Sequence, residues 1–446
     1  VLPLLVTLFM GMGINHIVID DDMMAMLPES LESKISWDAV QDEFGSTEVI
    51  FIAFGNKNKT IYRQETFSIL WELTEALENL DQVEKVSSIA TLSRMDSQNG
   101  FMEISDLQPG QELTPSQIKQ IKDYLEKNPS VKKRAISQGD EYFNIMIQPY
   151  EDVPHDVMRN VVVEVGDRIL PNGYDIHYGG TAYITGSVPT MIRNDITILL
   201  KIGLLIMAIV LMINLRNTFA VAMVFAIIIQ SLVVMAGFMG WMVFFTGSER
   251  FYFTIINSSM PIILLTIANS DGVHFVTKFF KEMRNKKDVK KSLEATMGAL
   301  LVPIFLTSLT TIAAFSSLSF APIKQLMGYG ICISVGIAYA FILSSTFLPG
   351  VILIKKWNMT SKAVTQASIF EKMTAYFGGK VTSNPRLILG IGALVALLGV
   401  FGLMYLKVDV NIASFFREGT EFRNSIDFID QEMTGTMDVR VRLEGS

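Results

Sequence analysis

The chain has 446 residues, of which 50 % are apolar and 18 % are charged, and its formal net charge is −7. Soluble domains carry about 25 % charged residues, so the composition argues against an all-soluble enzyme. The acidic balance argues against nucleic-acid binding through basic charge. The single cysteine, Cys332, excludes a disulfide framework and a cysteine zinc cluster. With four scattered histidines, we expect neither a metal nor a cofactor.

The first segment, residues 1–14, is apolar but shorter than the roughly 20 residues that span a bilayer. It could be the core of a signal peptide, but no Lys or Arg precedes it and no clear cleavage site follows. We therefore expect the end of a truncated membrane span.

Residues 15–190 have the composition of a water-soluble domain. Apolar runs and alternation predict strands at 49–54, 83–88, 142–147 and 174–178. Helices are expected at 64–80 and 155–169 and from Thr114-Pro115, a capping residue followed by proline. Strands and helices in this order predict an α+β sandwich of the split βαβ, ferredoxin-like kind.

Six long apolar runs follow, and each is long enough to cross a membrane. They cover residues 196–215, 219–245, 251–276, 300–320, 328–354 and 387–406. Lys and Arg gather in the connections 278–298 and 355–386, whereas the opposite short loops contain only Arg250 and Lys324. Because basic loops face the cytoplasm, we expect the domain 15–190 and the stretch after residue 406 to lie outside.

The linker 357–385 contains a stretch, 368–383, with apolar side chains on one helical face: Ile369, Phe370, Met373, Tyr376, Phe377 and Val381. This pattern predicts an amphipathic helix on the inner membrane surface. A loosely ordered basic loop is the alternative.

An internal repeat joins the two ends of the chain. Residues 407–446 repeat 18–57 without a gap, with the matches Asp20–Asp409, Glu29–Glu418, Asp38–Asp427 and Glu43–Glu432. In both copies an apolar span leads into an aspartate, a short turn and a helix. Unless the agreement is due to chance, the repeat predicts a parallel two-half transporter. The chain would then hold the first half and the start of a second outer domain.

Two membrane segments carry a pattern found in a known family. Residues 269–275 read Asn-Ser-Asp-Gly-Val-His-Phe, and residues 303–315 begin at Pro303 and contain three threonines; Gly179-Gly180-Thr181 precedes the second span. With the layout of spans, these segments resemble the RND (resistance–nodulation–division) superfamily, particularly the exporters grouped with MmpL proteins and hopanoid transporters. The resemblance implies a helical bundle of RND type with a periplasmic domain. Many drug-efflux members have adjacent acids on the fourth helix, whereas here Asp271 stands alone.

Asp271 is the main candidate for function. A carboxylate at membrane depth is unfavourable by about 2.5–3.5 kcal/mol, so such a group can load a proton from outside and release it inside. The expected proton relay comprises Asp271, His274, Thr310, Thr311, Thr307, Ser270 and Asn269. A structural hydrogen bond is the alternative for Asp271, helix packing for His274, and bonding to the helix backbone for the threonines.

The combined expectation is a proton-driven exporter of lipids or other amphiphiles in the bacterial inner membrane, with the large domain in the periplasm. Its expected partners are protons, the amphiphile, membrane lipids and a second RND half of the same polypeptide, and it could form a homo-oligomer. A translocation helper resembling SecDF and a non-transporting sensor resembling the sterol-sensing unit remain alternatives. An enzyme is least expected, because no nucleophile–base pair or metal cluster is apparent.

Overall fold

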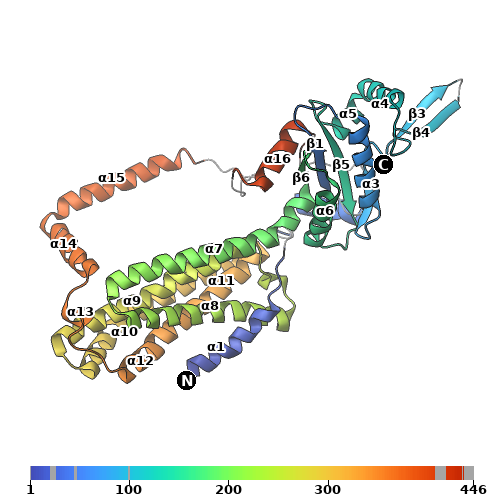
Figure 1. Cartoon of the computed structure of the whole chain (residues 1–446). Coiled ribbons are helices and arrows are strands. Elements are labelled where there is room, and N and C mark those ends of the chain that lie inside the picture. Colours follow the sequence, from blue (N-terminus) through green and yellow to red (C-terminus); the bar gives the residue numbers. More distant parts are fainter. Residues whose placement is uncertain are drawn as a thin grey trace. The chain divides into compact units, whose positions relative to one another are not determined.

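The computed structural model describes residues 2–20, 27–44, 48–98, 101–406, 418–433 and 435. The chain divides into two compact units (Figure 1). The membrane unit comprises Val1–Asp20 and Met191–Val408. The second unit comprises Asp21–Thr190 and Asp409–Ser446 and is called the outer unit, after the location that the sequence predicts for it.

The chain is mostly helical, and the described residues contain six helices long and apolar enough to cross a membrane, as predicted. They are α7 (Thr181–Leu215), α8 (Thr218–Thr246), α9 (Met260–Lys286), α10 (Val289–Ser316), α11 with α12 (Lys324–Ile342 and Leu348–Ile354) and α15 (Pro385–Leu403). A π-helical turn, Leu343–Phe347, joins α11 to α12. Residues 1–14 form the shorter helix α1 (Leu2–Met12) and part of the 3₁₀ turn Gly13–His16.

Three predicted spans, 196–215, 251–276 and 300–320, do not begin where the helices of the structure begin, because apolar residues mark the part of a helix that suits lipid and not its ends. The span expected at 196–215 is the last part of α7, which begins at Thr181. The span expected at 251–276 opens with 3₁₀ turns and becomes α-helical only at Met260. The basic connection 278–298 is mostly helical, since α9 continues to Lys286 and α10 begins at Val289, capped by Asp288, whose side chain accepts from Lys291 N.

Glycines allow α1 to approach α8 closely. A Cβ atom at Gly237 or Gly240 would collide with the backbone carbonyl oxygens of Met10 and Gly13. Trp241 fixes the contact, because its Nε1 donates to the Phe9 carbonyl at 3.2 Å. Small residues that let backbones meet are the usual means of helix packing in membranes.

The predicted amphipathic helix is α14 (Ile369–Ser383), which follows the short helix α13 (Lys362–Thr365). The Ser368 side chain caps α14 by accepting from Glu371 N at 3.1 Å. Glu371 in turn accepts two hydrogen bonds from Arg284 Nη2, at 2.6 and 2.7 Å, which tie the start of α14 to the end of α9. The apolar face of α14 is exposed, at Phe370 and Phe377 among others.

The outer unit is built on a four-stranded sheet in which neighbouring strands are antiparallel. The strands are β1 (Ile50–Gly55), β2 (Val83–Ser87), β5 (Tyr142–Pro149) and β6 (Asp175–Gly179), in the order β2-β5-β1-β6. Helix α3 (Gln64–Glu78) connects β1 to β2, and α6 (His155–Ile169) connects β5 to β6. Four predicted strands and two predicted helices therefore occur where they were expected.

Between β2 and β5 the chain forms elements that the sequence pattern did not all predict. The hairpin β3–β4 (Ser93–Gln98 and Phe101–Asp106) and the helix α5 (Pro129–Ala135) were not expected. Helix α4 (Pro115–Lys127) begins at the predicted Thr114, which forms a capping box with Gln117.

Both faces of the sheet are covered. Along β1, Ile50, Ile52 and Phe54 point into the core shared with α3 and α6. The alternate residues Phe51 and Ala53 lie on the other face, where they pack with the helix α16 (Glu421–Glu432). Helix α16 occupies the place in the second copy of the repeat that α2 (Glu32–Phe44) holds in the first. Residues 407–417, 434 and 436–446 of that copy lie outside the described residues.

Candidate functional site

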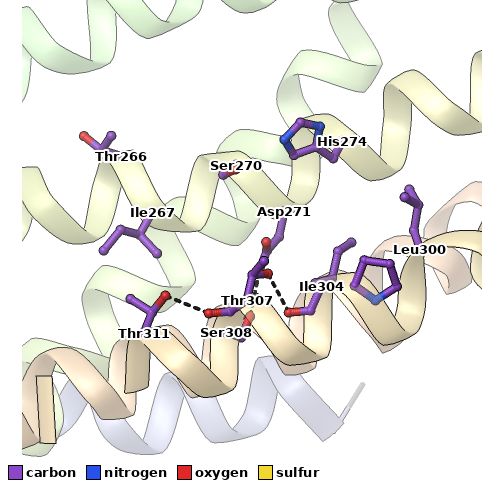
Figure 2. A pocket seen from close by; sticks show the side chains of 11 residues that line it. Thr266, Ile267, Ser270, Asp271, His274, Leu300, Ile304, Thr307, Ser308 and Thr311 are labelled. Atoms are coloured by element: carbon purple, nitrogen blue, oxygen red, sulfur yellow. Dashed lines mark hydrogen bonds between the residues drawn. The ribbon is translucent and has the colours of Figure 1, made fainter. Parts of the chain in front are cut away.

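A cavity of about 580 Å³ lies between α9 and α10 (Figure 2). The two helices pack against each other, and α10 contains the three closely spaced threonines Thr307, Thr310 and Thr311. From α9 the cavity is lined by Thr266, Ile267, Ser270, Asp271 and His274, and from α10 by Leu300, Pro303, Ile304, Thr307, Ser308 and Thr311. Seven of these eleven side chains are polar, and Asp271 and Ser308 are the buried ones among the seven.

Asp271 is buried, with 9 % of its surface exposed. Its side chain points from α9 toward α10, where the Ser308 hydroxyl donates to Oδ2 at 3.1 Å (Figure 2). No Lys or Arg of the described residues forms an ion pair with this carboxyl group. A buried carboxylate supported by a neutral hydroxyl is held less firmly in its charged form than one paired with a cation.

His274 and Ser270 lie within one helical turn of Asp271, and both line the cavity. Both side chains are exposed. The structure thus brings His274 to the site that the sequence predicted, as an accessible group beside the buried acid. A hydrogen bond links Asp271 to Ser308 and not to this histidine.

The predicted threonines divide into two kinds. Thr307 and Thr311 line the cavity, whereas Thr310 does not. All three donate to carbonyl oxygens of their own helix: Thr307 to Ile304 at 2.9 Å, Thr311 to Thr307 at 2.7 Å, and Thr310 to Leu306 and Thr307 at 3.0 Å. Each hydroxyl can still accept a hydrogen bond from water, but only Thr307 and Thr311 offer that capacity to the cavity.

Asn269 also lies outside the cavity lining. Its side chain is partly buried, and its Oδ1 atom has no hydrogen-bond partner among the described residues. Asn269 and Thr310 are therefore the two predicted relay residues that the structure does not bring to the cavity.

Ser308 and Thr266 are the polar lining residues that the sequence interpretation missed, and Ser308 is the more important because of its place beside Asp271. Ser308 is buried, and it is the direct hydrogen-bond partner of the central carboxyl group. The signal was helical periodicity, because Ile304, Ser308 and Thr311 are spaced by four and three residues and so share one face. The same periodicity places Thr310 off this face.

The cavity lining contains two titratable side chains, Asp271 and His274. The described residues contain no group of three or more His, Cys, Asp or Glu side chains placed to hold a metal ion. A buried carboxyl group at the wall of a cavity can take up and release a proton where water reaches the cavity. The exposed imidazole of His274 lies in the same lining as a second titratable group.

Comparison with known proteins places these features in a family. The chain is 22 % identical, over 366 residues, to MJ1562 of Methanocaldococcus jannaschii, which is named as a membrane protein; the match covers 79 % of this chain and 89 % of that protein. Residues 25–386 match the MMPL family, and this stretch contains the sheet of the outer unit, α7–α12 and the Asp271 cavity. The resemblance to RND and MmpL-like proteins is confirmed. The chain is a membrane protein that belongs to the MMPL family.

Proposed function

We propose that the protein is a proton-driven exporter of the RND type, which moves a lipid or another amphiphile from or across the bacterial inner membrane. Membership of the MMPL family supports transport as the general activity. The observation that carries the more specific proposal is the buried Asp271 carboxyl group, which meets Ser308 and a cavity between two membrane helices.

Protonation of Asp271 would drive the change of state. Removing the charge changes how strongly Ser308 and the cavity water hold the side chain. A proton shifts a conformational equilibrium only through its different affinity for the two states, so α9 and α10 would pack differently in the charged and neutral forms. His274, Thr307 and Thr311 would carry the proton through water in the cavity. Ser270 also belongs to this path.

The same proposal assigns the outer unit to the periplasm. The excess of Lys and Arg in the connections 278–298 and 355–386 supports a cytoplasmic location for those segments. The units β1-α3-β2 and β5-α6-β6 and the strand order β2-β5-β1-β6 support a ferredoxin-like domain. The internal repeat supports a molecule with two such halves in one polypeptide.

The test combines transport with identification of the substrate. Lipids and amphiphiles that copurify with the full-length protein are compared by mass spectrometry between wild type and Asp271→Asn, and proton-dependent export of any enriched species is then measured. We expect one species enriched above bulk lipid, and no export in Asp271→Asn although the variant folds. Thr310→Val is the matched control, because Thr310 lies outside the cavity lining. Unchanged export in Asp271→Asn would sink the proposal.

A further inference from the structure

A second, smaller cavity of the membrane unit lies at the ends of α7 and α9, where α13 packs against α9 and α14 begins (Figure 1). Its volume is about 10 Å³, which is room for about one water-sized group. The side chains that give this cavity its polar character are Asn214, Arg216, Thr277, Arg284, Gln366 and Glu371.

The charges around this cavity do not balance. The Arg284 guanidinium is fully engaged, since Nη2 donates to both carboxylate oxygens of Glu371 and Nη1 donates to the Gln366 carbonyl at 3.3 Å. Arg216 also lines the cavity, but its side chain forms no ion pair or hydrogen bond within the described part of the chain. The lining therefore has one positive charge in excess, which suits an anionic group.

Two neutral side chains of the same lining lack partners. Thr277 Oγ1 and Asn214 Oδ1 are buried, and neither forms a hydrogen bond with a described residue. A hydroxyl can donate one hydrogen bond, and an amide group donates from its nitrogen; a flip of the Asn214 amide brings that nitrogen to the position of Oδ1. With the Arg216 guanidinium, these groups supply donors from three side chains around a space of one oxygen atom.

The backbone at Arg216 indicates that its side chain is needed there. Arg216 has a φ of 51°, in the left-handed region that glycine adopts readily and arginine does not. The residue lies in the turn between α7 and α8, and Asn217 after it caps α8 by accepting from Ala220 N at 3.0 Å. A glycine would make this turn with less strain, so the turn itself does not require arginine.

Exposed apolar side chains flank the cavity. Met212 and Ile213 in the last turn of α7 are exposed, and so is Phe370 in the first turn of α14. A basic cavity between membrane helices, next to such apolar surface, is the setting in which proteins bind the head groups of anionic lipids. Inorganic phosphate would use the cavity but not the apolar side chains beside it.

We propose that this cavity binds one phosphate oxygen of an anionic membrane phospholipid, whose acyl chains lie along the ends of α7 and α14. The lipid is a resident ligand of the helix ends and not the exported cargo. The inference rests on the proposed function only where it assigns this end of the helices to the inner leaflet. It makes the lipid composition of the membrane a determinant of how α13 and α14 attach to α9.

Lipid binding to the purified full-length protein tests the site. Dioleoylphosphatidylglycerol is the probe, its binding is measured by native mass spectrometry, and melting temperatures are recorded in detergent with and without it. Arg216→Gly removes the charge from a position whose backbone suits glycine. Lys287→Gly is the matched control, because Lys287 has a φ of 53° and lies at the same end of α9 but outside the cavity lining. Thr277→Val removes the unpartnered hydroxyl with little change in shape.

We expect Arg216→Gly to bind phosphatidylglycerol roughly tenfold more weakly, the effect of losing one charge-assisted hydrogen bond. Thr277→Val should also bind it more weakly, and Lys287→Gly should bind it like wild type. Without added lipid, the melting temperatures of Arg216→Gly and Thr277→Val should equal or exceed that of wild type, because one change relieves backbone strain and the other removes an unpartnered polar group.

Wild-type affinity in Arg216→Gly, or an equal loss in Lys287→Gly, would overturn the proposal. So would equal binding of phosphatidylcholine, whose ammonium group cancels the negative charge. If inorganic phosphate alone raised the melting temperature as much as phosphatidylglycerol does, the site would be one for free anions and not for lipid. Asp271→Asn should bind the lipid like wild type, so failure of the transport mechanism and failure of this site are read separately.

Discussion

The Ser308 hydroxyl donates a hydrogen bond to the buried carboxyl group of Asp271, from the neighbouring helix and at a separation of 3.1 Å. This contact joins the residue that the sequence singled out to one that it did not. Because both residues lie at the cavity between α9 and α10, the bond is placed to respond to the charge on Asp271 and to the spacing of the two helices.

Removing this hydroxyl should slow transport without unfolding the protein. We expect export by Ser308→Ala to fall roughly tenfold, because a hydrogen bond to a charged group contributes about 1.5–3 kcal/mol and 1.4 kcal/mol corresponds to a factor of ten. Ser308→Thr keeps the hydroxyl and should retain most activity. Initial export rates in vesicles with a fixed proton gradient measure the effect. A wild-type rate in Ser308→Ala would show that the bond has no part in transport.

Loss of the hydroxyl at Thr307 or Thr311, which line the cavity, should slow export more than loss of the hydroxyl at Thr310. Thr307→Val and Thr311→Val remove hydroxyls that line the cavity, whereas Thr310→Val removes one that does not. Valine nearly preserves the shape of threonine, so the comparison isolates the hydroxyl. We expect slower proton-coupled export in the first two variants and a near wild-type rate in Thr310→Val. Equal loss in all three variants would instead indicate a shared structural role in α10.

Helix α1 depends on a close backbone approach at Gly237. Gly237→Ala places a Cβ against the Met10 carbonyl oxygen. We expect this overpacking to lower the free energy of unfolding by about 1–3 kcal/mol. Gly298→Ala in α10 is the matched change, since no atom lies within 4 Å of the new Cβ; it should be neutral or stabilising by about 0.5–1 kcal/mol. Thermal unfolding in detergent separates the two. Equal melting temperatures would mean that α1 moves away at little cost.

The ion pair between Arg284 and Glu371 should anchor α14 to α9. Both side chains are partly buried, and Nη2 lies 2.6 Å from Oε1. We expect Arg284→Glu to weaken the attachment and the exchanged pair Arg284→Glu with Glu371→Arg to restore much of it, with a coupling energy near the upper end of the about 0–1 kcal/mol range of surface pairs. Protease cleavage within the linker 357–385 gives the readout. Additive effects of the two changes would rule out direct coupling.

The sequence predicted much of the fold because burial leaves a clear pattern. The apolar run around β1 has no polar alternation, since the sheet is covered on both faces. Helix ends were harder to place, because α9 and α10 continue as charged helix outside their apolar stretches. The hairpin β3–β4 was missed because its strands are polar, although Asn99-Gly100 between them is a known hairpin signal.

The sequence predicted which helices contribute residues to the site, but it predicted less well which face of each helix lines the cavity. Asp271 stood out because a carboxylate within an apolar membrane segment is energetically unfavourable and therefore indicates a functional role. Residue type alone grouped Asn269 and Thr310 with their neighbours, whereas the spacing of three and four along each helix separates them from the cavity. The partner Ser308 could not be assigned, because the sequence does not tell which face of α10 meets α9.

The helix α16, which covers the second face of the sheet, is synthesised long after the strands that it covers. The strands end at Gly179, but the helix that completes their second face begins only at Glu421, after the six candidate membrane helices have been made. At about 5–20 residues per second, this interval lasts roughly 10 to 50 seconds. During that time the sheet face around Phe51 and Tyr142 lacks the helix that covers it, so the packing of this sheet is completed only after the last candidate membrane helix has been made.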